Sequence, residues 1–310
     1  MASARWQDGL AHNGSVALAT RGYGGDGPDL LFIPGAGQTL ADCDLLAPFL
    51  TPHHRVVAMD LRSHGSSGDG PFSWLAALDD IETVIASTGL VRPSVVGHSL
   101  GGMLAAHYGA RHPESPGVVN LDGHGTARPD QYPGIATDVV TERLAELHAL
   151  RDLQLAAAQQ GPTVLTLALF EATVSHYRTR YELDDAFVRQ ALTRAHVPTN
   201  GGWHPRVPLV VTLEIVRSVE ALDFHALYQN CKAPLLVINA IKPDPTPPGS
   251  PDWMPEHLAA YRHGITLDLA ARASQQPSFE LLELDVTHAL IYEEPELISK
   301  HIVAFLSQTA

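Results

Sequence analysis

Short apolar segments alternate with longer amphipathic segments along most of the chain. Residues 30–33 are four consecutive apolar residues between Pro28 and Pro34, a pattern typical of a strand that is covered on both faces. Further strands are predicted at 55–59, 94–97, 117–121, 234–239 and 279–284, and helices at 41–50, 73–87, 100–111, 255–274 and 295–306. Strands separated by helices of this length need right-handed parallel crossovers. The pattern therefore predicts an α/β protein with a doubly wound, mostly parallel sheet.

This alternation has a different beginning and one long interruption. Residues 6–11 and 15–21 flank Asn13-Gly14, whose tolerance of positive φ suits a two-residue hairpin turn, so we expect the chain to open with an antiparallel pair. The alternation stops near Gly125, and helices are predicted at 139–160, 164–177, 184–195 and 214–228. We expect a core domain made of residues 1–127 and 229–310, interrupted by a helical cap domain at 128–228.

The charge balance and the cysteine content of the chain indicate which partners and which cellular compartment to expect. The 310 residues are 45% hydrophobic and carry a formal net charge of −14, which repels phosphate backbones and anionic lipids, so nucleic acid and membranes are not expected partners. Only Cys43 and Cys231 could pair, and the N-terminus lacks an apolar leader, so a cytoplasmic protein is expected. The composition does not decide whether the protein forms a homo-oligomer.

Two patterns that suggest cofactors are weak. The 17 histidines form no zinc-binding spacing, so no metal site is expected. Gly22-x-Gly24-x-x-Gly27 has the spacing of a dinucleotide site, but Pro28 and a strand follow it instead of the helix that would hold the pyrophosphate. We therefore expect a plain loop at residues 22–27. This disfavours a dinucleotide-dependent oxidoreductase, and no cofactor is expected.

A nucleophile motif stands between a strand and a helix. Gly97-His98-Ser99-Leu100-Gly101 follows the apolar strand at 94–97 and opens the helix at 100–111. A sharp strand-to-helix turn exposes the serine hydroxyl and requires small residues two positions away on either side. The helix start also presents free N–H groups to a developing oxyanion. Ser99 is therefore the candidate nucleophile.

At this point the sequence resembles the α/β-hydrolase superfamily over essentially the whole chain outside the expected cap. Three further segments carry the resemblance: Phe32-Ile33-Pro34-Gly35-Ala36-Gly37, Met59-Asp60-Leu61-Arg62-Ser63-His64-Gly65-Ser66-Ser67, and Asp285-Val286-Thr287-His288-Ala289-Leu290. They look like the family's oxyanion loop, its Asp-x-Arg-Gly-His-Gly-x-Ser segment and the loop of its catalytic histidine. Pro34 departs from the histidine that usually precedes the oxyanion glycine. The resemblance implies His288 as the general base, and the backbone N–H groups of Ala36 and Leu100 as the oxyanion hole.

The acid that orients His288 has two candidates. The resemblance places it after the first strand beyond the cap, where Asp244 comes one or two positions late between two prolines. Asp122 ends the strand at 117–121, with Gly123 and Gly125 permitting a tight turn. Haloalkane dehalogenases and fungal zearalenone lactonases look similar in placing their acid there. We favour Asp122 and keep Asp244 as the alternative.

A serine nucleophile with this apparatus attacks an acyl carbon, so hydrolysis of a carboxylic ester or lactone through an acyl-enzyme is the leading hypothesis. Another acyl hydrolase, a C–C bond hydrolase, or a ligand receptor without turnover are the alternatives, because the superfamily reuses this site. We expect a neutral, fairly hydrophobic substrate of small to medium size. Apolar residues available in the cap and nearby are Leu165, Leu167, Leu169, Phe170, Tyr177, Tyr181, Trp203 and Trp253, and most are expected to serve packing.

Overall fold

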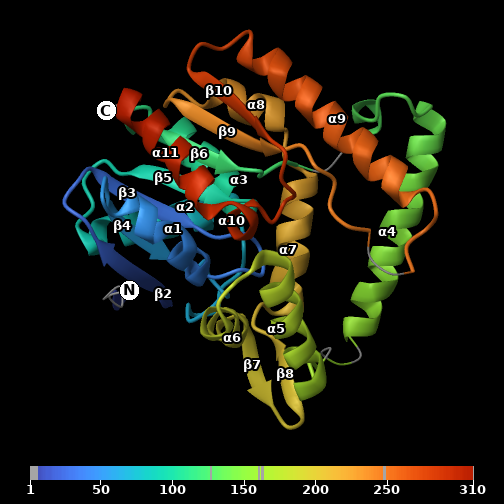
Figure 1. The fold of residues 1–310 in the computed structure, drawn as a ribbon, viewed down its shortest axis with the longest axis horizontal. Coiled ribbons are helices and arrows are strands. Elements are labelled where there is room, and N and C mark those ends of the chain that lie inside the picture. Colours follow the sequence, from blue (N-terminus) through green and yellow to red (C-terminus); the bar gives the residue numbers. More distant parts are fainter. Residues whose placement is uncertain (1–5, 126–127, 160, 162–163, 247–248, 310) are drawn as a thin grey trace.

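A computed structural model describes residues 6–125, 128–159, 161, 164–246 and 249–309. Its centre is an eight-stranded sheet of order β1-β2-β4-β3-β5-β6-β9-β10 (Figure 1). The strands are β1 Gln7–Asn13, β2 Val16–Gly24, β3 Asp29–Ile33, β4 Arg55–Met59, β5 Ser94–His98, β6 Val118–Leu121, β9 Leu235–Ala240 and β10 Phe279–Leu284. The strands from β4 to β10 are parallel, whereas β1 and β2 are antiparallel to their neighbours. This arrangement confirms the doubly wound sheet and the opening hairpin.

Helices cover both faces of the sheet because successive side chains of each strand point to opposite sides. Leu31 and Ile33 of β3 join a core with α2 (Trp74–Thr88), α3 (Leu100–Arg111) and α9 (Met254–Ala273). Leu30 and Phe32 join the other core, with α1 (Cys43–Leu50) and α11 (Pro295–Thr309). A strand with apolar residues at every position is therefore needed where helices lie on both sides.

Between β6 and β9 the chain forms α4 Thr137–Gln159, α5 Leu167–Tyr181, α6 Asp185–Arg194, β7 His196–Thr199, β8 Gly202–Pro205, α7 Leu209–Glu220 and α8 Phe224–Asn230. The prediction of helices alone was wrong here, because β7 and β8 form a hairpin around Asn200-Gly201. The predicted helix at 164–177 starts late, since Leu165 pairs with Trp203. The predicted helix at 214–228 is divided, since Asp223 caps the start of α8. The expected domain boundary at residue 127 and the helix end at Gln160 lie outside the described residues.

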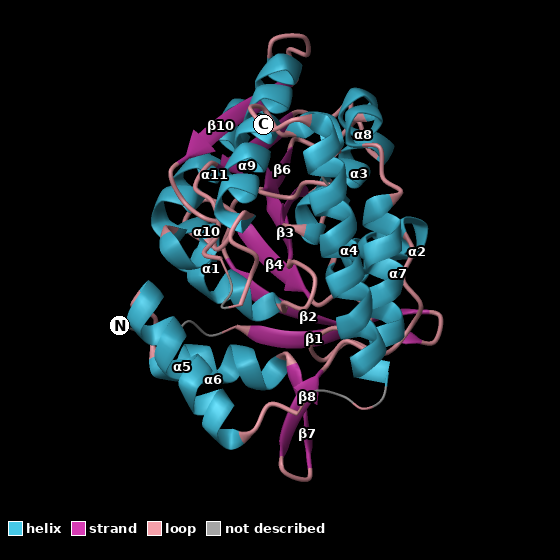
Figure 2. Ribbon diagram, turned by 90° about the vertical axis from the view of Figure 1, so that its right-hand side faces the viewer, coloured by secondary structure: helices cyan, strands magenta, loops and turns pink. Residues whose placement is uncertain are grey.

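The helices α5 and α6 and the β7–β8 hairpin lie together at one end of the molecule (Figures 1 and 2). Phe170, Val174 and Val188 form their small hydrophobic core. Arg194 of α6 reaches into the sheet unit, where its guanidinium donates to the buried Asp60 carboxylate at 2.6 and 3.0 Å. A buried charge with a fully engaged partner is costly to separate, so this pair fixes where α6 sits.

Two further observations bear on the sequence predictions. In the described part of the chain, no helix has the length and apolar character needed to cross a membrane. Gly22 and Gly24 lie in β2, and β3 follows Gly27. The glycine-rich segment is therefore partly strand. A side chain at Gly25 or Gly27 would collide with the carbonyl groups of His54 or His53, so these glycines allow close backbone packing.

Candidate active site

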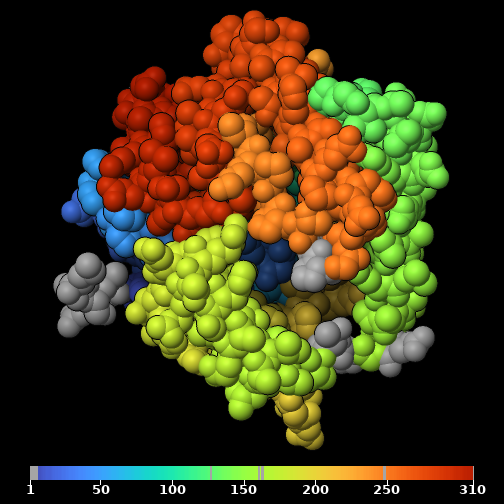
Figure 3. Space-filling view, turned by 45° about the vertical axis from the view of Figure 1, so that its right-hand side comes forward, coloured from blue at the N-terminus to red at the C-terminus, as the bar shows by residue number. Residues whose placement is uncertain are grey.

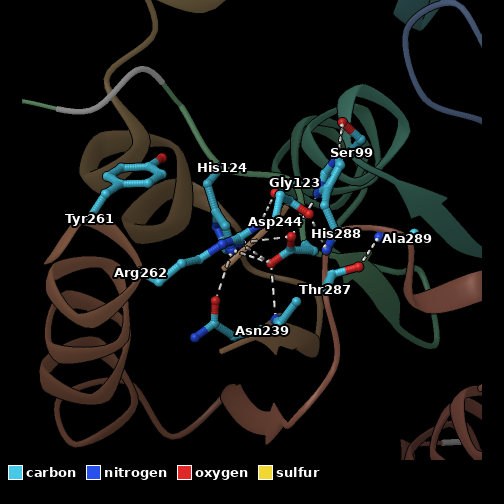
Figure 4. Close-up of polar contacts among 12 residues, drawn as sticks. Ser99, Gly123, His124, Asn239, Asp244, Tyr261, Arg262, Thr287, His288 and Ala289 are labelled. Atoms are coloured by element: carbon cyan, nitrogen blue, oxygen red, sulfur yellow. Dashed lines mark hydrogen bonds and ion pairs between the residues drawn. The ribbon is translucent and has the colours of Figure 1, made fainter. Parts of the chain in front are cut away.

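Three sequence-predicted residues meet where strands of the sheet end. Ser99 follows β5, Asp122 follows β6, and His288 lies in the loop after β10. His288 Nε2 lies 3.1 Å from Ser99 Oγ, and His288 Nδ1 lies 2.6 Å from Asp122 Oδ2 (Figure 4). An ionised carboxylate only accepts hydrogen bonds, so the Nδ1 proton faces Asp122 and leaves Nε2 free to accept from Ser99. Ser99, His288 and Asp122 thus form one hydrogen-bonded series.

The backbone at Ser99 has φ 53° and ψ −117°, a conformation that side chains seldom adopt. Its N–H donates to the Leu121 carbonyl at 2.9 Å, which holds the turn to the neighbouring strand. A Cβ at Gly97 would lie 2.0 Å from the Gly101 carbonyl oxygen, and a Cβ at Gly101 would lie 2.2 Å from the Ile33 carbonyl oxygen. Both glycines are needed because the turn, the helix and β3 approach within contact distance.

Asp122 is a fully buried carboxylate with several donors. Besides His288, the Arg262 guanidinium donates to both oxygens at 2.9 and 3.0 Å. His124 Nε2 and the Ala240 N–H complete the set, at 3.1 and 3.0 Å from Oδ1. Burial alone would raise the pKa of Asp122, but the hydrogen bonds from His124 and His288 and the charges of His124 and Arg262 hold that pKa well below its usual range. The carboxylate is thus ionised.

Asp244 contacts a different part of His288. Its Oδ1 accepts the backbone N–H of His288 at 3.0 Å, and its Oδ2 accepts from Arg262 Nη2 at 3.1 Å. The side chain of Asp244 is 44% exposed, whereas that of Asp122 is wholly buried. Of the two candidate acids, the structure brings Asp122 to the imidazole ring and Asp244 to the main chain of the same residue.

The described residues contain no group of three or more His, Cys, Asp or Glu side chains that could hold a metal ion. The model of the alpha/beta hydrolase family matches residues 30–300. The chain belongs to the alpha/beta hydrolase family.

Curated and solved relatives of this α/β hydrolase are distant. The pimeloyl-[acyl-carrier protein] methyl ester esterase of Nitrosomonas europaea is 26% identical over 250 residues, which span 77% of this chain and 86% of that protein. The crystal structure of E-2-(acetamidomethylene)succinate hydrolase has a TM-score of 0.71 at 20% identity and covers 98% of this chain and 100% of its own. The enol-lactonase from Burkholderia xenovorans has a TM-score of 0.65 at 19% identity, with 96% and 100% covered. The structural likenesses show a shared fold.

The loop after β3 in this α/β hydrolase is ordered by one side chain. Gln38 Oε1 accepts the Gly35 N–H at 3.0 Å and lies 2.7 Å from His98 Nδ1. The main-chain N–H groups of Ala36 and Leu100 have no protein acceptor in the described part of the chain. Both residues flank Ser99, since Leu100 follows it and a Cβ at Gly35 would lie 3.1 Å from the Ser99 Cβ. These two N–H groups are the ones that the sequence selects as oxyanion donors.

His98 ties this loop to the loop of His288. Its Nε2 lies 2.9 Å from the His288 carbonyl oxygen, and the two imidazole rings lie against each other at an interplanar angle of 35°, with centroids 4.9 Å apart. Burial, and secondarily the charge of His288, lowers the pKa of His98 to about 3. A pKa this low means that His98 does not compete with His288 as a base.

A hollow opens between the α5–α6 region and the segment that leads to α9, with atoms of the early chain at its floor (Figure 3). Next to the Gly37–Gln38 turn lies a cavity of about 210 Å³, lined by apolar residues of α6 and by Tyr177 and Tyr292. Of the other predicted apolar residues, Phe170 and Trp203 stack on each other, and Leu167 and Leu169 are exposed. A second cavity, of about 420 Å³, begins at His124 and extends between α8 and α9.

Several residues of the site were missed by sequence reasoning. Arg262 and Asn239 carry no local signal, because Arg262 is one arginine inside a helix and Asn239 is one polar residue inside a buried strand. His124 stands in no motif either, yet its Nε2 lies 3.1 Å from both Asp122 Oδ1 and Asn239 Oδ1. Arg262 lies 140 positions from Asp122 along the chain, and His124 lies 115 positions from Asn239. Only the folded arrangement of strands brings them together.

We predict that Gly101→Ala destabilises the protein by about 3 kcal/mol, because the added Cβ must push the Ile33 and Pro34 carbonyls away. Urea unfolding measures the change. Gly22→Ala is the matched control, since its Cβ would meet only the Gln7 carbonyl oxygen at 3.8 Å, and it should change stability by less than about 1 kcal/mol. Equal effects of the two substitutions would contradict the tight contact at Gly101.

A second prediction concerns Asp42, which lines the smaller cavity and accepts a hydrogen bond from Tyr292 at 2.8 Å. Burial raises the pKa of Asp42 to about 7. Between pH 4 and 7 the folded state keeps a proton that the unfolded state releases, so Asp42 makes the protein less stable as pH rises. Asn does not titrate, so Asp42→Asn should gain about 3 kcal/mol relative to wild type between pH 4.5 and pH 8. Urea midpoints at both pH values test this, and a pH-independent difference would refute it.

Proposed function

We propose that the chain is a serine hydrolase that cleaves a carboxylic ester or lactone through an acyl-enzyme on Ser99. One observation carries the proposal: Ser99 Oγ, the His288 ring and Asp122 form one hydrogen-bonded series of 3.1 and 2.6 Å. The unbonded N–H groups of Ala36 and Leu100 beside Ser99 add to it. In this proposal Ser99, His288 and Asp122 are the catalytic triad, with Asp122 preferred to Asp244.

The first half of the proposed reaction acylates Ser99. Ser99 Oγ attacks the carbonyl carbon while its proton passes to His288 Nε2, and the carbonyl π pair moves onto oxygen. The Ala36 and Leu100 N–H groups receive that oxyanion. The anionic Asp122 stabilises the imidazolium. When the oxyanion re-forms the carbonyl, the C–O bond to the leaving alcohol breaks and His288 returns the proton to the alkoxide.

The second half repeats these steps with water. His288 accepts a proton from water as its oxygen attacks the acyl carbon, and the same N–H pair receives the negative charge. Collapse breaks the bond to Ser99 Oγ, which takes the proton back from His288, and the acid is released. A lactone gives the hydroxy acid by the same two halves. Serine chemistry of this kind uses no metal and no redox cofactor.

The proposed substrate is a small, neutral and fairly hydrophobic molecule, and residues 128–228 act as the cap that selects it. In this proposal the cavity of about 210 Å³ beside the Gly37–Gln38 turn receives the acyl part of the substrate, and α6 contributes its apolar wall while Asp42 also lines it. The net charge of −14 disfavours an anionic substrate approaching over long range. The names of the esterase from Nitrosomonas europaea and of the enol-lactonase state ester and lactone chemistry for those proteins.

The experiment that tests the proposal combines labelling with turnover. Wild type should hydrolyse p-nitrophenyl esters and react with a fluorophosphonate probe at Ser99, whereas Ser99→Ala should do neither. Ser66→Ala, at an exposed serine, is the matched control and should react like wild type. Asp122→Asn should lower kcat by about 10⁴-fold, while Asp244→Asn should cost about 10-fold or less at pH 8. Tight ligand binding without labelling would indicate a receptor instead of an enzyme. Turnover by Ser99→Ala would refute the assignment of Ser99 as the nucleophile.

The cavity also predicts substrate preference. Neutral p-nitrophenyl butyrate should be cleaved with a kcat/KM at least about 10-fold above that of the p-nitrophenyl hemisuccinate anion, because an apolar wall cannot pair a charge. Ala191→Trp fills the cavity and should lower kcat/KM for long acyl chains more than for acetate. Gln190→Trp, at an exposed position of the same helix, should leave the profile unchanged. A preference for the charged ester would contradict the assigned substrate class.

A further inference from the structure

We propose that Arg262 and Asp244 are positioning residues that adjust the basicity of His288 in opposite directions. The proposal rests on the proposed function, in which His288 is the general base. The name acid clamp is used here for the three residues Asp122, Arg262 and Asp244. Neither Arg262 nor Asp244 touches the reacting atoms, so both would act through the residues they hold.

The acid clamp closes a ring of contacts around His288. Arg262 Nη1 donates to both oxygens of Asp122, and Nη2 donates to Asp244 Oδ2 at 3.1 Å. Asp244 Oδ1 in turn accepts the His288 N–H at 3.0 Å, while Asp122 Oδ2 accepts from the His288 ring at 2.6 Å. Arg262, Asp244, His288 and His124 converge in Figure 4. The ring and the main chain of one histidine are thus held by two carboxylates that share one guanidinium.

The geometry requires an arginine. A planar guanidinium presents separate N–H groups to two carboxylates at once, whereas a lysine ammonium is a single compact charge. Burial opposes the charge on Arg262, whose side chain is 9% exposed, yet Asp122 and then Asp244 outweigh it and raise the pKa of Arg262. Arg262 therefore stays charged, and the two carboxylates offset the cost of burying that charge.

The charges of the acid clamp have opposite consequences for His288. Arg262 neutralises much of the Asp122 charge, which weakens the stabilisation of the imidazolium and lowers the basicity of His288. Asp244 adds a second negative charge beside His288 and raises that basicity. The acid clamp has a net charge of −1, which becomes neutral with the imidazolium when His288 accepts a proton. Arg262 thus holds Asp122 in place, while the net negative charge of the acid clamp still favours transfer of a proton to His288.

Other titratable or charged groups also face His288. The ring of His98, at the end of β5, lies against the His288 ring, and His124 in the loop after β6 also contacts Asp122. Glu293 of α10 (Leu290–Glu293) accepts the Thr287 N–H beside it, and Arg180 of α5 lies 3.7 Å from Glu293. These groups are unchanged in every variant below, so a difference between variants reports the acid clamp.

The test is the pH dependence of kcat/KM, whose acid limb reports the pKa of the base in the free enzyme. Arg262→Gln removes a positive charge, so the limb should move to higher pH by about 0.5–1 unit. Asp244→Asn removes a negative charge, so the limb should move to lower pH by about 0.5 unit. Arg262→Lys keeps the charge and should leave the limb near wild type while kcat falls. Arg262→Gln combined with Asp244→Asn restores the net charge and should return the limb toward wild type.

Matched controls separate electrostatics from folding. Arg62→Gln breaks another buried arginine–aspartate pair, with Asp80, and should destabilise the protein without moving the limb. Asp69→Asn removes the same charge at an exposed aspartate paired with Arg206 and should move nothing. Shifts of opposite sign for Arg262→Gln and Asp244→Asn support the proposal. No shift, or shifts of the same sign, would overturn it. If Arg262→Gln does not fold, a shift to lower pH in Asp244→Asn together with no shift in Arg262→Lys supports the proposal, and an unmoved limb in Asp244→Asn overturns it.

A measurement without turnover keeps this proposal separate from the proposed function. In a Ser99→Ala background, NMR titration of the His288 ring, assigned by its loss in His288→Gln, gives the pKa directly. Opposite shifts by Arg262→Gln and Asp244→Asn in an otherwise inactive protein support the acid clamp even where wild type hydrolyses no ester. Unchanged His288 titration in an active enzyme refutes the acid clamp and leaves the serine hydrolase standing.

Discussion

The buried charge of Asp122 constrains the site more than any other group. A carboxylate without solvent is stable only when its lone pairs are filled, and here donors come from four segments: the loop after β6, the end of β9, α9 and the loop after β10. Each donor fixes the position of its own segment relative to β6. The orientation of the His288 ring is thus a consequence of satisfying one buried anion.

The same edge of the sheet stores strain at two neighbouring strand ends. Ser99 and Asp122 both have positive φ, at 53° and 52°, and their N–H groups continue the hydrogen bonding of the adjacent strands, to Leu121 and Ile238. Such conformations persist only where the surroundings determine them fully. At Ser99 the close backbone packing around Gly97 and Gly101 fixes the conformation. At Asp122 the surrounding hydrogen-bond donors fix it. Both side chains consequently leave the sheet in the directions that bring them to His288.

Much of the fold follows from local patterns: the apolar run of the buried strand at 55–59 and the helix at 100–111, which the serine turn opens, were predicted to the residue. The β7–β8 hairpin was missed although Asn200-Gly201 has the same turn signal as Asn13-Gly14, because its strands are four residues long and show no alternation. Ser99 and His288 stand in motifs with sequence signatures. Arg262 stands in none, because its role exists only through carboxylates that lie 140 and 18 positions away.

The presence of two carboxylates at the histidine has a physical reason. Asp122, at the end of β6, contacts the His288 ring, and its negative charge is paired with the positive charge of Arg262. A buried anion needs such a partner to be stable. A second carboxylate at the end of β9 then balances the arginine and anchors the main chain of His288. Asp122 therefore contacts the ring and Asp244 anchors the main chain of the same histidine, whereas the sequence offered the two residues as alternatives for a single role.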